Sequence, residues 1–273
     1  MFQVQKIDSL QLPELQPYRT MRRQHEHRQQ GIFVAEGEKV VRRLLASRFG
    51  VVSVLLPEKW FLELRSFLEA RPENVQVFLA EKSLLETLTG FSMYQGLLAV
   101  GKVPSPVPLT EILEASRPPY LLVALDGLSS AENVGALVRN CAAFGVHALL
   151  IGETSSSPFL RRAVRSSMGT VFQLPIVECA GLVSTLQDLR SRGIRCIAAH
   201  PHVTGKTPSQ CNLVDSCCLV FGNEGYGLAP ATLAACEEAV AIPMASEIDS
   251  LNVSSAAAVF LYEMNRQRVS IPK

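Results

Sequence analysis

Two polar, glycine-bearing loops contain residues whose types and spacing suit ligand binding and catalysis. The first, LDGLSSAENVG, contains Asn133 and leads into a helical pattern that carries Arg139. The second, FGNEGYGL, has three glycines around Glu224, the first of them Gly222. Glycine permits a positive φ and lets a ligand approach the backbone closely, whereas a plain turn does not need three glycines around an acid. The second loop is therefore predicted to bind a ligand.

A third polar loop follows the apolar run EAVAIP. Ser250 and Asn252 flank Leu251 in this loop, and Ile242 and Met244 lie in the I-P-M segment before them. Hydroxyl and amide side chains supply neutral hydrogen bonds, so the loop is a candidate to complete a binding site.

Structural roles are the alternative for several of these residues. Asn133 and Ser250 are residue types that cap the N-termini of helices, and a solvated surface residue is the alternative for Arg139. Any one of the loops is thus a weak indication of function.

Strand-like and helical patterns alternate through the part of the chain that holds the loops. Near-continuously apolar strands are typical of a parallel sheet covered by helices on both faces, so this part is predicted to be α/β. Ligands of such folds bind beyond the carboxyl ends of strands, where the polar loops lie. The predicted strands are 120–125, 147–151, 171–177, 194–199, 217–221 and 238–243. The predicted helices are 133–144, 160–167, 182–192, 229–236 and 252–267.

A proline-rich stretch at 102–120 separates this part from the residues before it. Proline removes backbone donors and disfavours helix before it, so the stretch is predicted to be a linker. The boundary is placed near residue 105, giving domains of residues 1–105 and 106–273. Short β-rich runs alternate with helical patterns in the first, which is predicted to be a small α/β domain.

Composition narrows the class of protein. The 273 residues include 26 Lys and Arg against 25 Asp and Glu, which excludes a histone-like polycation but not a local basic face. Seven cysteines without a C-x-x-C pair indicate reduced core thiols of a cytosolic protein. No apolar run approaches the roughly 18 residues of a membrane span, and the N-terminal segment lacks the apolar core of a signal peptide. We therefore expect a cytoplasmic protein.

Taken together and in this order, the loops resemble the motifs of the SpoU (TrmH-like) family of RNA ribose 2′-O-methyltransferases, in the SPOUT class. The resemblance rests on N-x-G-x-x-x-R from Asn133 to Arg139, G-N-E-G-x-G-L from Gly222, and I-P-M followed by S-L-N-V-S. It covers about residues 120–267, and the joint occurrence of the motifs is highly specific. The segment GIFVAEGEKVVRRLL also resembles the F-x-x-E-G-x-x-x-V pattern of the family's substrate-binding extension, whose fold is similar to a small RNA-binding ribosomal protein. Ser246 departs from the pattern, because family members usually have glycine there.

The resemblance implies a SPOUT-type parallel-sheet methyltransferase domain with a C-terminal trefoil knot, preceded by the small α/β substrate-binding domain. It implies that the knotted loops bind S-adenosylmethionine through Gly222, Ile242, Met244 and Leu251. It also implies a homodimer through the knotted domain, in which the motif-one arginine of one subunit completes its partner's site.

In the reaction that the resemblance implies, a ribose 2′-hydroxyl of RNA takes the methyl group of the cofactor. The family's proposed base is the arginine matching Arg139, but a protonated guanidinium has no acceptor. Arg139 is better suited to binding phosphate and stabilising a developing alkoxide, and Glu224 is the nearest acceptor in the motifs that could orient it. The candidate catalytic residues are Asn133, Arg139, Glu224, Ser250 and Asn252.

Two basic clusters are predicted to contact RNA phosphates, the second of them on a helix near the site. They are Arg19, Arg22, Arg23 and Arg28, and Arg161, Arg162 and Arg165. A solvated charged face is the alternative for any one of these residues.

Other interpretations compete with this one. A Rossmann-type dinucleotide enzyme would explain Glu153 as a ribose-binding acid, but the first loop lacks G-x-G-x-x-G. A non-catalytic RNA-binding relative is disfavoured by the retained polar residues. A metal at His200 and His202 is disfavoured because further ligand spacing is missing. Ribosomal RNA is favoured over transfer RNA because the extension resembles those of ribosomal-RNA enzymes.

Overall fold

The computed structural model of the chain describes residues 2–89, 96–203, 206–245 and 249–269. Two compact units make up the chain. The first comprises Met1–Ser105 and Phe159–Gln173, and the second comprises Pro106–Pro158 and Leu174–Lys273. This division differs from the predicted one in that residues 159–173 pack with the first unit. As a division of function, the boundary near residue 105 stays a prediction.

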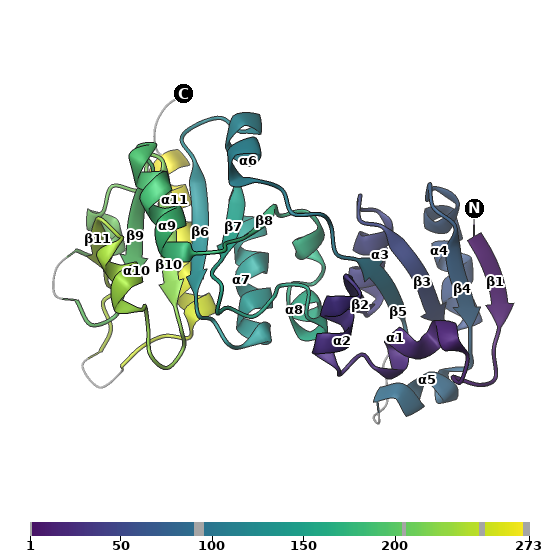
Figure 1. Cartoon of the computed structure of the whole chain (residues 1–273). Helices are drawn as coiled ribbons and strands as arrows, with labels where there is room; N and C mark the ends of the chain where they lie inside the picture. The colour runs from purple at the N-terminus through teal and green to yellow at the C-terminus, as the bar shows by residue number, and fades with distance from the viewer. Residues whose placement is uncertain (1, 90–95, 204–205, 246–248, 270–273) are drawn as a thin grey trace. The chain divides into compact units, whose positions relative to one another are not determined.

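The second unit is built on a six-stranded parallel sheet in the order β11-β9-β10-β6-β7-β8 (Figure 1). All of its paired neighbours are parallel, so the predicted parallel α/β arrangement is confirmed. The strands are β6 (Leu121–Asp126), β7 (Ala148–Ile151), β8 (Ile176–Glu178), β9 (Arg195–Ala199), β10 (Cys217–Gly222) and β11 (Glu238–Val240).

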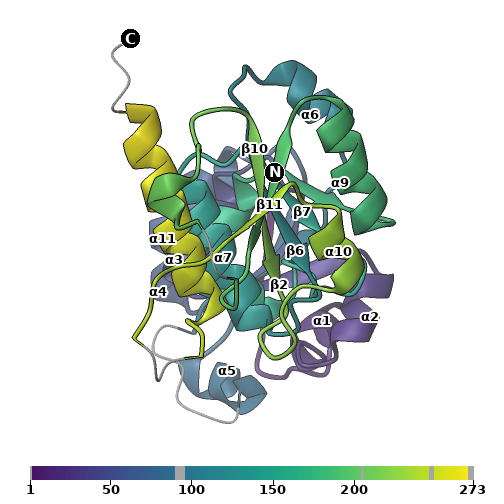
Figure 2. The same ribbon diagram turned by 90° about the vertical axis from the view of Figure 1, so that its left-hand side faces the viewer.

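Helices cover both faces of this sheet (Figure 2). On one face lie α7 (Ala131–Ala143) and α11 (Val253–Val269), which pack against each other. On the other lie α6 (Leu109–Ala115), α9 (Leu182–Ser191) and α10 (Pro230–Ala234). Side chains of β10 alternate between the two cores: Cys218 and Val220 join the α9 side, while the Phe221 ring lies 5.8 Å from that of Phe260 in α11.

The first unit has a mixed five-stranded sheet in the order β1-β4-β3-β5-β2. β5 runs antiparallel to both β3 and β2, whereas β1, β4 and β3 are parallel. The strands are β1 (Phe2–Lys6), β2 (Ile32–Glu36), β3 (Val51–Leu56), β4 (Val75–Leu79) and β5 (Leu98–Lys102). The helices described in residues 2–89 and 96–105 are η1 (Pro13–Leu15), α1 (Gln16–Arg19), α2 (Gln24–Gln29), α3 (Glu38–Leu45), α4 (Glu58–Glu69) and α5 (Lys82–Thr89).

The predicted strand 171–177 is wrong, because its apolar residues belong to two different cores. Thr170–Phe172 form a 3-10 turn, η2, in the first unit, and pairing begins at Ile176 in β8. The Phe172 ring lies 5.5 Å from Phe33 and 5.3 Å from Phe49, both in the first unit. An apolar run therefore marks burial here without marking a strand.

An ion pair joins residues 159–173 to the rest of the first unit. Glu36 ends β2 as a buried carboxylate, and burial of a charge is costly unless it is paired. Arg161 and Arg165 of α8 (Arg161–Ser166) supply the partners: Arg161 donates to Glu36 Oε2, and Arg165 Nη1 lies 3.4 Å from Oε1. α8 therefore belongs to the first unit, and its predicted place near the methyltransferase site stays a prediction.

Replacing Glu36 by Ala leaves the Arg161 guanidinium without its buried partner. Breaking such a pair costs about 3–5 kcal/mol, so we expect a loss of that order in the unfolding free energy of the first unit. Glu63→Ala is the matched control, because Glu63 pairs with Arg42 at a more exposed site, where pairs contribute less than about 1 kcal/mol. Denaturant unfolding followed by the fluorescence of Trp60, the chain's one tryptophan, measures both. Equal losses in the two variants would show that this ion pair does not hold residues 159–173.

Candidate active site

Three neighbouring strands of the second unit end at one cavity of about 360 Å³. Its lining includes Ala199 at the end of β9, Gly222 at the end of β10 and Val240 at the end of β11. This carboxyl edge is where ligands of parallel α/β folds bind. Eight of the predicted site residues also line the cavity, namely Asn133, Gly222, Glu224, Ile242, Met244, Ser250, Leu251 and Asn252.

Gly222 begins a tight loop whose own backbone requires glycine. The loop is closed by backbone hydrogen bonds between Asn223 and Gly227 in both directions, at 2.8 and 2.9 Å. A Cβ on residue 222 would lie 2.3 Å from the Gly227 carbonyl carbon and 2.4 Å from the Leu228 nitrogen. The close approach of a ligand is the predicted reason for this glycine. The structure adds a second reason, because a side chain at position 222 would clash with the backbone of Gly227 and Leu228.

The Glu224 carboxylate fastens this loop to the start of α7. Its oxygens accept hydrogen bonds from Asn133 Nδ2 (2.9 Å), from the backbone N–H groups of Ser129 and Ser130 (both 3.2 Å), and from the Ser129 hydroxyl (3.3 Å). Partial burial raises the pKa of Glu224, but the hydrogen bonds from Asn133 and the two backbone groups outweigh it and lower the pKa below the usual value. A carboxylate at a helix N-terminus is also favoured by the helix dipole.

Asn133 and Asn252 connect the first loop to the third. Asn252 Nδ2 donates to Asn133 Oδ1 at 3.0 Å, so a chain of hydrogen bonds runs from Asn252 through Asn133 to Glu224. The capping roles that were the alternatives for Asn133 and Ser250 belong to other residues. Ser130 caps α7, and its hydroxyl accepts from the Asn133 N–H at 3.3 Å. Asn252 Oδ1 accepts from the Ser254 N–H at 2.9 Å in the first turn of α11, while Ser250 is exposed at the cavity.

Arg139 lies apart from these residues. Arg139 is exposed on α7 and is not among the described residues that line the cavity. The contacts of Glu224 go to the start of α7, so the predicted orientation of Arg139 by Glu224 is not what the structure shows.

Comparisons with known proteins show the family to which the chain belongs. A family model described as the SpoU rRNA Methylase family matches residues 120–262. An uncharacterized tRNA/rRNA methyltransferase of Mycobacterium tuberculosis is 34% identical over 239 residues, which are 86% of this chain and 81% of that protein. The 23S rRNA (guanosine-2′-O-)-methyltransferase RlmB of Neisseria meningitidis is 33% identical over 203 residues, which are 74% of this chain and 80% of that protein. The chain belongs to the SpoU methyltransferase family.

A solved structure carries the likeness across both units. The SpoU methyltransferase AviRb from Streptomyces viridochromogenes, in complex with the cofactor AdoMet, is 26% identical with a TM-score of 0.82. The match covers 95% of this chain and 99% of that one. The protein is thus an S-adenosylmethionine-dependent RNA 2′-O-methyltransferase with the fold of this family. Among its described helices none is long and apolar enough to cross a membrane.

The side chains that line the cavity of this SpoU enzyme and were not assigned to it from the sequence include His200, His202 and Tyr226. The two histidine rings lie 5.9 Å apart, edge to face, directly after β9. Polar segments that follow a strand were expected to line the site. His200 and His202 directly follow β9 and could have been assigned to the site on the same ground. Within the described part of the chain, no group of three or more His, Cys, Asp or Glu side chains is arranged to hold a metal. Ser246 lies outside the described residues.

Glu153 has a structural role in this enzyme. Its Oε2 accepts from the Leu182 N–H at 3.0 Å, at the start of α9. The acid that a dinucleotide enzyme would use for a ribose therefore caps a helix.

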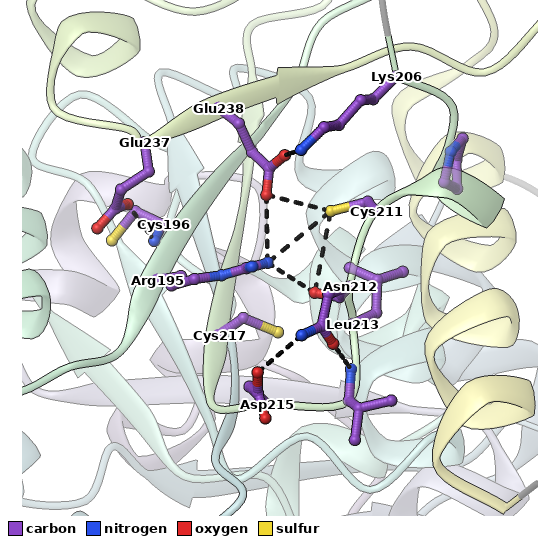
Figure 3. Close-up of polar contacts among 12 residues, drawn as sticks. Arg195, Cys196, Lys206, Cys211, Asn212, Leu213, Asp215, Cys217, Glu237 and Glu238 are labelled. Carbon is purple, nitrogen blue, oxygen red and sulfur yellow. Dashed lines mark hydrogen bonds and ion pairs between the residues drawn. The ribbon is translucent and has the colours of Figure 1, made fainter.

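A cluster of polar contacts fastens the connection between β9 and β10 (Figure 3). Arg195 of β9 lies between the Glu238 carboxylate (3.2 Å) and the Asn212 carbonyl (2.6 Å), and Lys206 pairs with Glu238 at 2.9 Å. The Cys211 thiol donates to the same carboxylate at 3.3 Å. Burial and the neighbouring Glu238 raise the pKa of Cys211 to about 11, which favours the protonated thiol as a hydrogen-bond donor in this cluster.

Most of the predicted RNA-binding arginines are exposed, and several of these also contact other residues of the protein. Arg19 Nη1 donates to the Leu12 carbonyl at 3.1 Å, and Arg23 pairs with Glu26 at 3.0 Å. The arginines with exposed side chains include Arg22, Arg28, Arg162 and Arg165. Contact of these residues with RNA stays a prediction.

The lowered pKa of Glu224 makes the anchoring of its loop pH-dependent. Above the unfolded-state pKa, near 4.5, the stabilisation of the folded state is fully present. It is lost as the pH falls through the folded-state pKa, because the protonated acid no longer accepts all four hydrogen bonds. We therefore expect Glu224→Gln to lower the unfolding free energy at pH 7 by about 1 kcal/mol or less, since the group is exposed.

The difference between the wild type and Glu224→Gln should disappear in acid. Unfolding in denaturant, measured at pH 7 and at pH values below 4, tests this. Glu114→Gln, on the exposed side of α6, is the control for a general charge effect. A Glu224→Gln effect of the same size at every pH would contradict the linkage.

Proposed function

We propose that the enzyme methylates a ribose 2′-hydroxyl of ribosomal RNA in the cytoplasm, acting as a homodimer. The observation that carries the proposal is the hydrogen-bonded chain Asn252–Asn133–Glu224, which joins all three polar loops at the mouth of the cavity. Ribosomal RNA is favoured over transfer RNA because RlmB, which matches 74% of this chain, is a 23S rRNA enzyme.

The residues of the cavity suit S-adenosylmethionine. Ile242 and Leu251 give it apolar walls, Met244 adds a flexible thioether, and Gly222 brings the backbone to its surface. When bound, the cofactor supplies a methyl group on a positively charged sulfur. We assign these residues to holding it.

We assign the polar residues to positioning. Glu224 and Asn133 hold the three loops in one geometry, while the exposed Ser250 hydroxyl at the cavity is available to the ribose. Arg139 is assigned to a phosphate of the RNA and to the developing alkoxide, for which a guanidinium is suited.

A second copy of the chain would bring Arg139 to a cavity. Asn140, beside Arg139 on α7, donates from Nδ2 to the Ser254 carbonyl of α11 at 2.7 Å, so these helices form one surface. α11 exposes Val259 and Tyr262 on one face, at 41% and 60%. Apolar side chains gathered in this way are typical of an interface. We propose that this face dimerises, that Arg139 acts at the partner's cavity, and that the C-terminal region has the trefoil knot of its family.

We also propose a division of labour between the units. The first unit, with Arg22, Arg23 and Arg28 exposed in or near α2, selects the RNA, and the second carries out the transfer.

The proposed substrate is tested by incubating the protein with labelled S-adenosylmethionine and, in separate reactions, with 23S, 16S and transfer RNA. Modified riboses are mapped by their resistance to alkaline cleavage. A methyl group on a base, or on transfer RNA alone, would overturn this assignment.

The requirement for glycine at position 222 predicts a specific loss of cofactor binding. Gly222→Ala forces the loop backbone apart, so we expect the Kd for S-adenosylmethionine to rise at least tenfold, about 1.4 kcal/mol or more. Gly225→Ala is the matched control, because its Cβ would meet nothing closer than Asn223 Oδ1 at 3.6 Å. Titration calorimetry with the cofactor compares the two variants. Similar affinities would show that this loop does not shape the binding site.

The shared site predicts complementation between Arg139→Ala and Gly222→Ala, assayed at an S-adenosylmethionine concentration far below the raised Kd of Gly222→Ala. Arg139→Ala should lower kcat by a factor of about 100 or more while the Kd for S-adenosylmethionine stays within about twofold, because Arg139 is outside the cavity of its own chain. Mixed with Gly222→Ala chains, it should recover about a quarter of wild-type activity, since half of randomly formed dimers pair one intact cavity with one intact arginine. No recovery in dimers verified to be mixed would place Arg139 in its own subunit's site.

A further inference from the structure

Tyr226 is a side chain at the cavity that neither the fold nor the assigned roles explain. It lines the cavity mouth and is 95% exposed. An aromatic ring buries large apolar area when it packs, and here almost none of that area is used. Its neighbours in the loop do have structural roles: Asn223 closes the turn, and Glu224 fastens it to α7.

The backbone that carries Tyr226 is firmly held. Its N–H donates to Asn223 Oδ1 at 3.1 Å, as does that of Gly225 at 2.8 Å, and Asn223 Nδ2 donates to the Gly127 carbonyl at 2.7 Å. The next residue, Gly227, pairs with Asn223 through two backbone hydrogen bonds. An aromatic side chain on such a loop loses little conformational freedom when it binds a partner.

The partner that fits an exposed aromatic ring here is an unstacked RNA base. A ribose can enter a cavity only if its nucleotide leaves the helical stack, and the base then needs a new flat partner. The carboxylate nearest in sequence, Glu224, is turned to the start of α7 by its four hydrogen bonds. Its oxygens thereby face neutral donors of the protein, which leaves the Tyr226 ring as the group of this loop that is free to meet a base.

We propose that Tyr226 stacks on the base of the nucleotide whose ribose enters the cavity, and so positions that ribose for methylation. This inference rests on the proposed function. It makes Tyr226 a substrate-positioning residue that reads the planar face of a base and not its hydrogen-bonding edge.

The test uses three variants and two RNAs. The wild type first identifies the modified ribose, and a short RNA containing it then serves as substrate at saturating S-adenosylmethionine. Tyr226→Phe keeps the aromatic face and should leave KM for RNA within about twofold of the wild type. Tyr226→Leu and Tyr226→Ala remove it and should raise KM for RNA by roughly five- to a hundredfold, the range that base stacking on aromatic side chains covers. The Kd for S-adenosylmethionine should be unchanged in all three.

The second RNA lacks the target base but keeps its ribose. The wild type should bind this RNA as weakly as Tyr226→Ala binds the intact one. Tyr226→Ala should bind the RNA without the base no more weakly than the wild type does, because the ring and the base act on each other. Additive losses, or an unchanged KM in Tyr226→Leu, would overturn the stacking role. A weakened Kd for S-adenosylmethionine with unchanged RNA binding would make Tyr226 a cofactor contact. If the wild type methylates no RNA ribose, the proposed function itself fails, and that result is separate from any difference among the variants.

Discussion

The carboxylate of Glu224 is the interaction on which the geometry of the site depends. It accepts four hydrogen bonds from the start of α7, and through Asn133 it is linked to Asn252 at the start of α11. Three segments from distant parts of the chain are held by one group. A buried or partly buried polar network is stable only when each of its groups has a hydrogen-bond partner. The residue types at positions 133, 224 and 252 therefore constrain one another. Replacing Asn133 by an apolar residue would remove one of the four donors to Glu224 and the acceptor of the Asn252 amide group.

Parallel strand order explains why so little sequence is needed to build the cavity. β11, β9 and β10 are neighbours although they are separated along the chain, and each ends at the same edge. The residues that directly follow each strand therefore line the cavity. The contacts of Arg195, Glu238 and Lys206 then fix the longest of these connections, the one between β9 and β10.

The sequence predicted what depends on local pattern and missed what depends on tertiary contact. Apolar runs located five of the six strands of the second unit, because parallel strands covered on both faces are apolar throughout. The same rule failed at Val171 and Phe172, which are buried in the other unit. Nothing local indicates that Arg161 pairs with Glu36, since the two are distant in sequence and a buried ion pair leaves no periodic signal. Cap identity was also out of reach: Ser130 and Asn252 were chosen over Asn133 and Ser250 by where the helices begin, which is uncertain by a residue or two from sequence.

The hydrogen bonds of the site also bear on how it would catalyse methyl transfer. Glu224 is poorly suited to accept a proton, because its oxygens already accept hydrogen bonds from four donors and its pKa is lowered. A guanidinium such as that of Arg139 has donors and no acceptor. The motif residues that carry charge are thus suited to alignment and to stabilising negative charge. Methyl transfer to a hydroxyl gains from alignment of the two reacting atoms, for which a rigid, fully bonded frame is the appropriate device. We infer that this frame contributes to catalysis mainly by holding the ribose oxygen in line with the methyl group.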